Sequence, residues 1–215
     1  AAKKEVFGDI GIEGMTAGPS EVTIVADKTS NPEWIASDLI GQAEHDVLAQ
    51  CILISKDKKI LELTRKEIFK QVKLIPRSSI AKKSLMTNGI LLNVSSDKKI
   101  IEIINKLGPE HLEILIKNYK PLVSKIKNAG SVCLGKYGVM AMTDYGVPGT
   151  NHVLPTNSTS KYSSGLNVSE FMKRISFITL SKKGIDKLGP SAITLANYEG
   201  LSAHAESIIK RIRRK

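Results

Sequence analysis

Short apolar runs and longer amphipathic stretches alternate from the N-terminus to about residue 135. The runs are rich in β-branched residues and are bounded by turn residues, which predicts buried strands. These strands cover residues 21–27, 50–55, 89–94, 111–116 and 131–134.

Apolar residues recur at helical spacing between these runs, which predicts amphipathic helices. The helices cover residues 34–45, 56–72, 98–106 and 121–127. The first has a clear start, because Asn31 can cap it, Pro32 suits its first turn and Glu33 favours the positive end of its dipole. The alternation indicates an α/β fold with an incomplete Rossmann-like parallel sheet and flanking helices. In such sheets ligands bind beyond the carboxyl ends of the strands, so we expect the site there.

The pattern changes after Gly135. Residues 143–165 form a long polar segment, and a loop of this length in a compact domain is usually functional or disordered. Beyond it the pattern predicts a short helix at 168–174, a possible strand at 175–180 and mainly helix at 191–213. We therefore predict two domains, a Rossmann-like domain over 1–165 and a small, mainly helical C-terminal domain over 166–215.

Charge adds a second possibility. The net charge is +11, and basic residues concentrate in 56–73 and in the tail 210–215. A basic surface can attract nucleic acid or phosphorylated ligands, although a lysine-rich solvated face gives the same pattern. Only 5% of the residues are aromatic, which argues against a platform that stacks single strands. Nucleic-acid binding is therefore the lesser hypothesis.

The cysteines and the apolar runs bear on the compartment. Cys51 and Cys133 lie in apolar runs without CxxC spacing, so we expect buried free thiols in a reducing cytoplasm and no cysteine metal site. No apolar run approaches the length of a membrane span. The first residues lack a secretory apolar region and an initiator Met, which favours a processed chain or a fragment.

The chain has only four histidines, and each has a carboxylate or an amide close by in the sequence. Histidine is the commonest metal ligand and the usual acid–base group near neutral pH. The four are His45, His111, His152 and His204. A scattered surface or core position explains any one of them alone, but four such neighbourhoods together suggest one site assembled from distant segments.

Two of these neighbourhoods lie in the predicted α/β domain. Gln42 and His45 are three residues apart on a predicted helix and share a face, which an ordinary polar helix surface also explains. Glu110 and His111 follow a helix-breaking Gly-Pro and stand at the start of a predicted strand. A carboxylate and an imidazole in one cleft can divide two proton transfers, whereas a polar strand edge is the simpler alternative.

The other two neighbourhoods lie nearer the C-terminus. Asp144 can supply a hard oxygen ligand and precedes His152 by eight residues in a Gly- and Pro-rich segment. Glu199 and His204 are five residues apart, roughly 140° around a helix, so they flank one ligand only if Gly200 loosens the turn. Carboxylate or amide oxygens with two imidazoles suit Zn²⁺ or a similar divalent ion.

Five stretches carry the most specific pattern. They are Gly18–Glu21, Ala36–His45, Gly108–Leu112, Gly149–Thr156 and Leu201–His204. In this order they resemble histidinol dehydrogenase, the zinc enzyme of the last steps of histidine biosynthesis, over nearly the whole chain. The segments Gln-Ala-Glu-His at 42–45 and Asn-His-Val-Leu-Pro-Thr at 151–156 are specific to that family.

The resemblance implies the oxidation of L-histidinol through L-histidinal to L-histidine with two NAD⁺. It implies Zn²⁺, or alternatively Mn²⁺, on four ligands: Gln42, His45, Asp144 and His204. Glu110 and His111 would be the acid–base pair, in which His111 takes the hydroxyl proton and Glu110 activates the water that hydrates the aldehyde. The substrate pocket would consist of the four metal ligands, Ser20, His111, His152 and Glu199.

The resemblance further implies a homodimer in which the C-terminal segment supplies Glu199 and His204 to the partner's site. Family members extend far beyond this N-terminus, and the preceding part carries most of the NAD-binding residues. We therefore expect this chain alone to bind Zn²⁺ or Mn²⁺ but to be inactive or weakly active. The competing hypothesis is a non-catalytic basic module that contacts nucleic acid or a protein partner.

Overall fold

The structure is a computed structural model that describes residues 2–6, 8–9, 18–146 and 151–212. Its contacts divide the chain into two compact units, Ala1–Met172 and Lys173–Lys215, and each unit is described by itself. A short helix, α1 (Ala2–Glu5), precedes the first strand. No helix of the described residues is long and apolar enough to cross a membrane.

The first unit is built on a five-stranded sheet in the order β3-β2-β1-β4-β5, and every pairing is parallel. Its strands are β1 (Glu21–Ala26), β2 (Gln50–Ser55), β3 (Gly89–Asn93), β4 (His111–Ile114) and β5 (Ser131–Leu134). The order reverses between β1 and β4, as in doubly wound folds. The predicted α/β class and all five predicted strands are confirmed.

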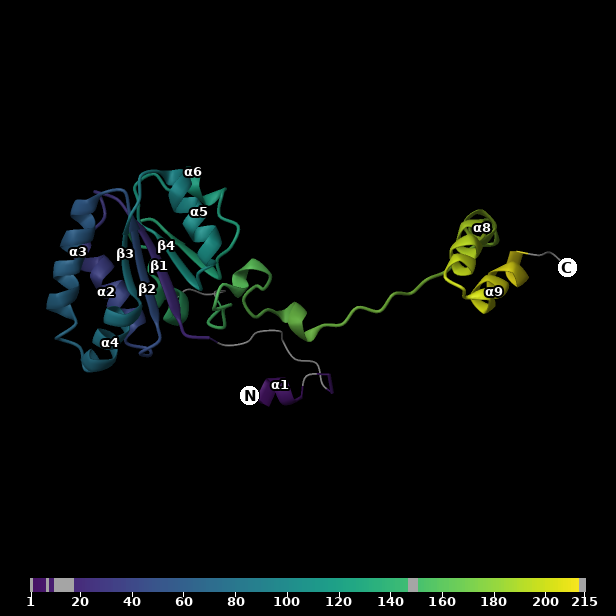
Figure 1. Ribbon diagram of the computed structural model, residues 1–215, viewed down its shortest axis with the longest axis horizontal. Coiled ribbons are helices and arrows are strands. Elements are labelled where there is room, and N and C mark those ends of the chain that lie inside the picture. Colours follow the sequence, from purple (N-terminus) through teal and green to yellow (C-terminus); the bar gives the residue numbers. More distant parts are fainter. Residues whose placement is uncertain (1, 7, 10–17, 147–150, 213–215) are drawn as a thin grey trace. The chain divides into compact units, whose positions relative to one another are not determined.

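Helices cover both faces of this sheet (Figure 1). One face packs against α2 (Pro32–Ala43), α3 (Lys58–Gln71), α4 (Ser78–Asn88) and the short α7 (Met140–Tyr145). The other face packs against α5 (Asp97–Leu107) and α6 (Lys120–Val123). Because side chains alternate along a strand, Val22 and Ile24 of β1 enter the first core and Val25 enters the second.

The helix start at Asn31 is confirmed in detail. The Asn31 side chain accepts the Glu33 N–H at 2.9 Å, and Pro32 occupies the first turn. Since α2 follows β1 and returns antiparallel to the strands, its last turn lies at the amino ends of the strands. This geometry decides where Gln42 and His45 are placed.

Besides the short α1, two α-helices in the described residues of the first unit were not predicted, α4 and α7. Helix α4 has no side-chain cap at Arg77, and its buried residues are the small Ala81 and Ser84, so its sequence shows little amphipathic pattern. Helix α7 buries only Met140 and lies partly within the segment predicted as a polar loop.

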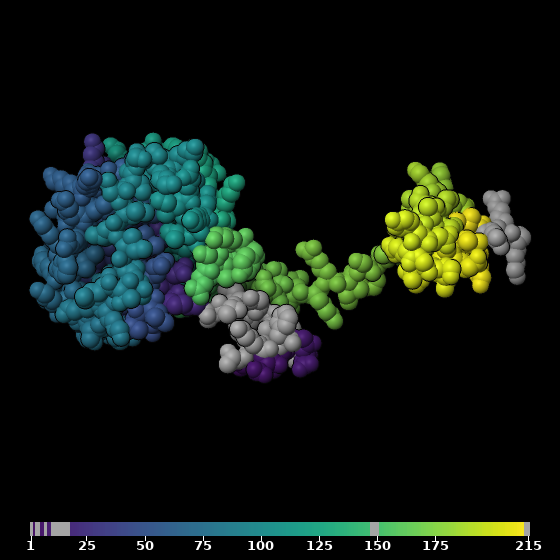
Figure 2. Space-filling model, in the orientation of Figure 1, coloured from purple at the N-terminus to yellow at the C-terminus, as the bar shows by residue number. Residues whose placement is uncertain are grey.

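The second unit is a pair of helices, α8 (Lys182–Tyr198) and α9 (Ser202–Ile212), shown in Figure 2 as a compact yellow body. The prediction of mainly helix at 191–213 is confirmed for the described residues, but α8 begins nine residues earlier, with Pro190 inside it. Gly200, at φ +75°, separates the two helices. Gly189 allows their close packing, since a Cβ there would lie 2.4 Å from Ile212 Cδ1.

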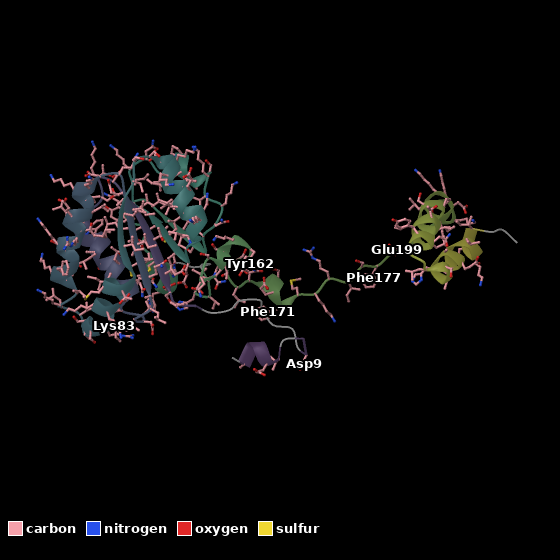
Figure 3. The ribbon with its side chains drawn as sticks, viewed as in Figure 1. Asp9, Lys83, Tyr162, Phe171, Phe177 and Glu199 are labelled. Atoms are coloured by element: carbon pink, nitrogen blue, oxygen red, sulfur yellow. The ribbon has the colours of Figure 1, made fainter. Side chains whose placement is uncertain are left out.

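The segment between the polar loop and α8 differs from its prediction. The helix predicted at 168–174 is a single 3-10 turn at Val168–Phe171, preceded by another at Thr159–Lys161. The strand predicted at 175–180 is absent, and these residues are extended and exposed, with Phe177 92% exposed (Figure 3). With no neighbouring strand in its own unit, this β-prone sequence has no ladder to join.

Candidate metal and acid–base site

The candidate residues of the first unit gather at the amino ends of the strands. Glu110 and His111 open β4, and Ser20 immediately precedes β1. The register pairs Val22 of β1 with His111, so these two strand starts are adjacent. Gln42 ends α2 at the same edge. The expectation of a site beyond the carboxyl ends is therefore wrong for these residues, because α2 and two strand starts converge at the opposite edge.

Glu110 is held in place by the backbone of the neighbouring strand. It is only 7% exposed, and its Oε2 accepts the Glu21 N–H at 2.8 Å. Burial raises the pKa of Glu110 to about 7, and the nearby Glu21 and Asp144 carboxylates act in the same direction. A carboxyl group with a pKa near neutrality can both release and accept a proton at physiological pH.

His111 is the buried neighbour of Glu110. Its Nε2 lies 4.0 Å from Glu110 Oε1, and its Nδ1 has no hydrogen-bond partner among the described residues. Burial lowers the pKa of His111, so the imidazole is neutral at pH 7 and can accept a proton. Asp144, His45 and His152 all act electrostatically on His111, which places them around it.

Asp144 and His152 also face each other. His152 Nδ1 lies 3.6 Å from Asp144 Oδ1, with the His152 side chain exposed and the Asp144 side chain 9% exposed. Asp144 Oδ1 accepts no hydrogen bond from the described residues. Residues 147–150, which the sequence pattern placed between the two, lie outside the described part of the chain.

Gln42 and His45 occupy the end of α2 and the turn after it. Gln42 is 1% exposed and its Nε2 has no partner among the described residues, whereas His45 is exposed. Leaving a buried polar group unpaired costs about 1–3 kcal/mol of folding free energy. The unpaired Gln42 Nε2, Asp144 Oδ1 and His111 Nδ1 are therefore typical of a site that takes a ligand.

Three of the four predicted metal ligands lie in the first unit. Among the described residues, no group of three or more His, Cys, Asp or Glu side chains could hold a metal ion. Gln42 supplies an amide, His45 an imidazole and Asp144 a carboxylate, which is one imidazole short of the predicted donor set. These donor types fit Zn²⁺, and a fourth ligand is needed to close a tetrahedral site.

Glu199 and His204 lie in the second unit. Glu199 caps the end of α8 (Figure 3), and His204 stands in the first turn of α9, both exposed. The turn at Gly200 removes the problem of a 140° offset, because the two residues do not share a continuous helix. Among the described residues, no side-chain atom of Glu199 or His204 forms a hydrogen bond.

The residue that the sequence analysis missed is Glu21. Its N–H holds Glu110, and its Oε1 accepts the Asn157 N–H at 3.0 Å, while Thr156 Oγ1 accepts the Gly18 N–H at 2.7 Å. These bonds tie the Asn151–Thr156 segment to the start of β1. Burial raises the pKa of Glu21 as well. Glu21 stands in the Gly18–Glu21 stretch, but only its strand role was predicted from it.

A family model described as histidinol dehydrogenase matches residues 1–212. The chain belongs to the histidinol dehydrogenase family. It is 73% identical over 215 residues to a histidinol dehydrogenase of Pelagibacter ubique, covering 100% of this chain and 50% of the relative. It is 46% identical over 207 residues to one of Listeria monocytogenes, covering 96% and 48%.

Structural comparison agrees with the sequences. The crystal structure of histidinol dehydrogenase from Elizabethkingia anophelis matches with a TM-score of 0.90 and 39% identity, over 98% of this chain and 48% of that one. The resemblance to histidinol dehydrogenase is thereby confirmed. The chain spans about half the length of the curated relatives it matches.

Proposed function

We propose that this chain is the part of a histidinol dehydrogenase that carries its metal and acid–base groups. The proposed reaction oxidises L-histidinol through L-histidinal to L-histidine, with two NAD⁺ as hydride acceptors. The observation that carries this proposal is the buried Glu110–His111 pair, a carboxyl group with its pKa raised to about 7 beside an imidazole with its pKa lowered. Most NAD contacts are proposed to come from outside this chain.

His111 is the proposed base for the alcohol step. Its lowered pKa keeps it neutral at pH 7, and its Nδ1 is bound to nothing among the described residues, so one ring nitrogen is free to take the hydroxyl proton. Glu110 is the proposed base for the aldehyde step, where it draws a proton from the water that adds to L-histidinal. The Glu21 N–H holds the Glu110 carboxylate in place for this transfer.

Zn²⁺, or Mn²⁺, is the proposed metal, on Gln42, His45 and Asp144 with His204 as the fourth ligand. When bound, the metal would hold the imidazole and amine of the substrate in position. The unpaired buried Oδ1 of Asp144 supports this assignment, because a metal would give it a partner. Ser20, His152 and Glu199 are the proposed substrate contacts, and Glu199 and His204 are proposed to act in the partner subunit of a homodimer.

Zinc binding by the purified chain tests the metal assignment directly. We expect stoichiometric Zn²⁺ after dialysis, measured by elemental analysis, and at least a tenfold weaker affinity for His45→Ala. Asp46→Asn is the matched control, because Asp46 is the exposed neighbour of His45. Equal Zn²⁺ affinity for the chain and for His45→Ala would contradict the proposed ligand set.

Turnover tests the acid–base assignment. In a chain extended to the length of its relatives, His111→Asn should abolish NAD⁺-dependent oxidation of L-histidinol while the zinc content persists. Loss of zinc together with activity would mean that the roles are wrongly assigned. The 215-residue chain alone should show little or no turnover, and activity equal to that of the extended chain would refute the dependence on the preceding part.

A further inference from the structure

A cavity lies at the edge of the sheet opposite the candidate metal site, beyond the carboxyl ends of β1 and β4. It has a volume of about 500 Å³ and is lined by the loop after β1, the first half of α2 and the residues after β5. Pockets for small molecules range over about 300–1,000 Å³, and in open parallel sheets they form where the strand order reverses. The residues of the candidate metal site do not line it.

Two aromatic rings form one wall of this cavity. Trp34 and Tyr137 come from α2 and from the turn after β5, with ring centroids 6.0 Å apart and planes inclined by 35°. Trp34 is 44% exposed and Tyr137 is 74% exposed, and the Lys136 ammonium lies over one face of the Tyr137 ring, 4.6 Å from its centroid. Such a wall favours a planar, apolar ring.

A carboxyl group forms the polar part of the lining. Asp38 lines the cavity from α2, and Glu113 of β4 lies fully buried within hydrogen-bond reach of it. Glu113 Oε1 accepts the Met140 N–H at 2.8 Å, which fixes the pair. Burial raises the pKa of both acids, that of Asp38 to about 6. A carboxylate here accepts hydrogen bonds and cannot donate them.

The hydroxyl and N–H donors of the loop after β1 are already occupied, and the cationic donor of the lining, Lys136, lies with its Nζ 4.6 Å from the centroid of the Tyr137 ring. The Ser30 hydroxyl donates to the Leu115 carbonyl oxygen, and the Thr29 N–H and hydroxyl both donate to Asp27. The Asn31 side chain accepts the Glu33 N–H at the start of α2, and the side chain of Glu33 is acidic. Phosphate binding at a helix start needs free N–H groups, so the start of α2 does not have the chemistry of a nucleotide phosphate site.

We propose that this cavity binds a planar amino-heterocycle, with two adjacent N–H groups on one edge of the ring donating to Asp38. Carboxylates accept two parallel N–H bonds in this way. The ring lies against Trp34 and Tyr137. This ligand differs from the proposed substrate of the metal site, and the two sites lie at opposite ends of α2.

Trp34 makes this proposal easy to test, because it is the only tryptophan of the chain. The probe is 2-aminobenzimidazole, titrated into the 215-residue chain while Trp34 fluorescence and binding heat are measured. The control probe is 1,2-dimethylbenzimidazole, which has the same ring system but no N–H donor. We expect saturable quenching by the first probe and at least tenfold weaker binding of the second.

Variants locate the binding. Asp38→Asn should weaken the 2-aminobenzimidazole affinity at least tenfold, whereas Glu33→Gln, an exposed neighbour on the same helix outside the lining, should leave it unchanged. Tyr137→Leu, at a mostly exposed position, should weaken binding without a folding defect. His45→Ala, which tests the proposed metal site, should have no effect, so the two proposals fail separately. No binding at millimolar probe, equal affinity for both probes, or an Asp38→Asn variant that binds normally would overturn the proposal.

Discussion

The substitution Glu110→Gln isolates the cost of ionising the buried carboxyl group. Gln has nearly the same shape, and its amide oxygen can still accept the Glu21 N–H that Glu110 accepts at 2.8 Å. In the folded chain the pKa of Glu110 is about 7, raised by burial from 4.5. A raised pKa means that the folded state holds its proton more tightly than the unfolded state. The stability from this group is therefore fully present below pH 4.5 and is lost as the pH rises through about 7.

The magnitude follows from the two pKa values. A difference of about 2.5 units corresponds to about 3 kcal/mol, at 1.36 kcal/mol per unit. Between about pH 4 and pH 8 the free energy of unfolding of the unaltered chain should thus fall by about 3 kcal/mol relative to Glu110→Gln. Asp38 and Glu113 also have raised pKa values, but their contributions are the same in both proteins and cancel in the difference.

Urea denaturation measured by Trp34 fluorescence is the suitable assay, because Trp34 lies in the first unit and reports on the sheet that holds Glu110. The unfolding free energies of the two proteins are compared at several pH values. If the two pH profiles run parallel, Glu110 does not ionise with a raised pKa, and the acid–base role proposed for it loses its physical basis.

Three further changes test other parts of the structure. Gly130→Ala should lower the unfolding free energy by about 1–3 kcal/mol in urea, because its Cβ would lie 2.6 Å from the Glu110 carbonyl oxygen; an unchanged midpoint would refute this contact. Gly189→Leu should abolish the α8–α9 packing, since even a Cβ there would lie 2.4 Å from Ile212 Cδ1. The helical circular dichroism signal should fall while the unfolding midpoint measured by Trp34 fluorescence stays constant. A retained helical signal would contradict the expectation. Burial raises the pKa of the Cys51 thiol to about 12, so Cys51 should resist a thiol reagent until urea unfolds the first unit, and labelling of the native chain would count against its burial.

The sequence predicted elements whose signal is local. All five strands were recognised because each is a short apolar run. The start of α2 was recognised because Asn31 caps the helix and Pro32 suits its first turn, and both effects act within one turn of the chain. Helix α4 was missed because its buried side chains, Ala81 and Ser84, are small, and the Ser84 hydroxyl is satisfied by the Ala49 carbonyl oxygen far away in the chain. The start of α8 was missed, since the prediction begins at 191 whereas the helix begins at Lys182 and continues through Pro190.

The sequence shows candidate residues for a site, but not which of them the fold brings together. Adjacent Glu110 and His111 are visible as a pair at the start of a predicted strand, yet which strand start lies beside them is decided by the pairing of β4 with β1. Glu21 was missed because it acts on Glu110 through its backbone N–H, which every residue except proline has. Whether His204 joins this site is a prediction that the fold of the separate units does not test.

The outer side of β3 bears on how this chain behaves at high concentration. Among the described residues no strand pairs with that side, and Ile90 and Leu91 on β3 are 44% and 37% exposed. The strand contains neither charge nor proline, the features with which proteins usually protect an open edge. The net charge of +11 keeps molecules apart when the Debye length is about 30 Å, at 0.01 M salt. At about 0.15 M salt this length shrinks to about 8 Å, so the colloidal stability of the chain should depend on ionic strength, and a lysine in place of Leu91 should remove that dependence.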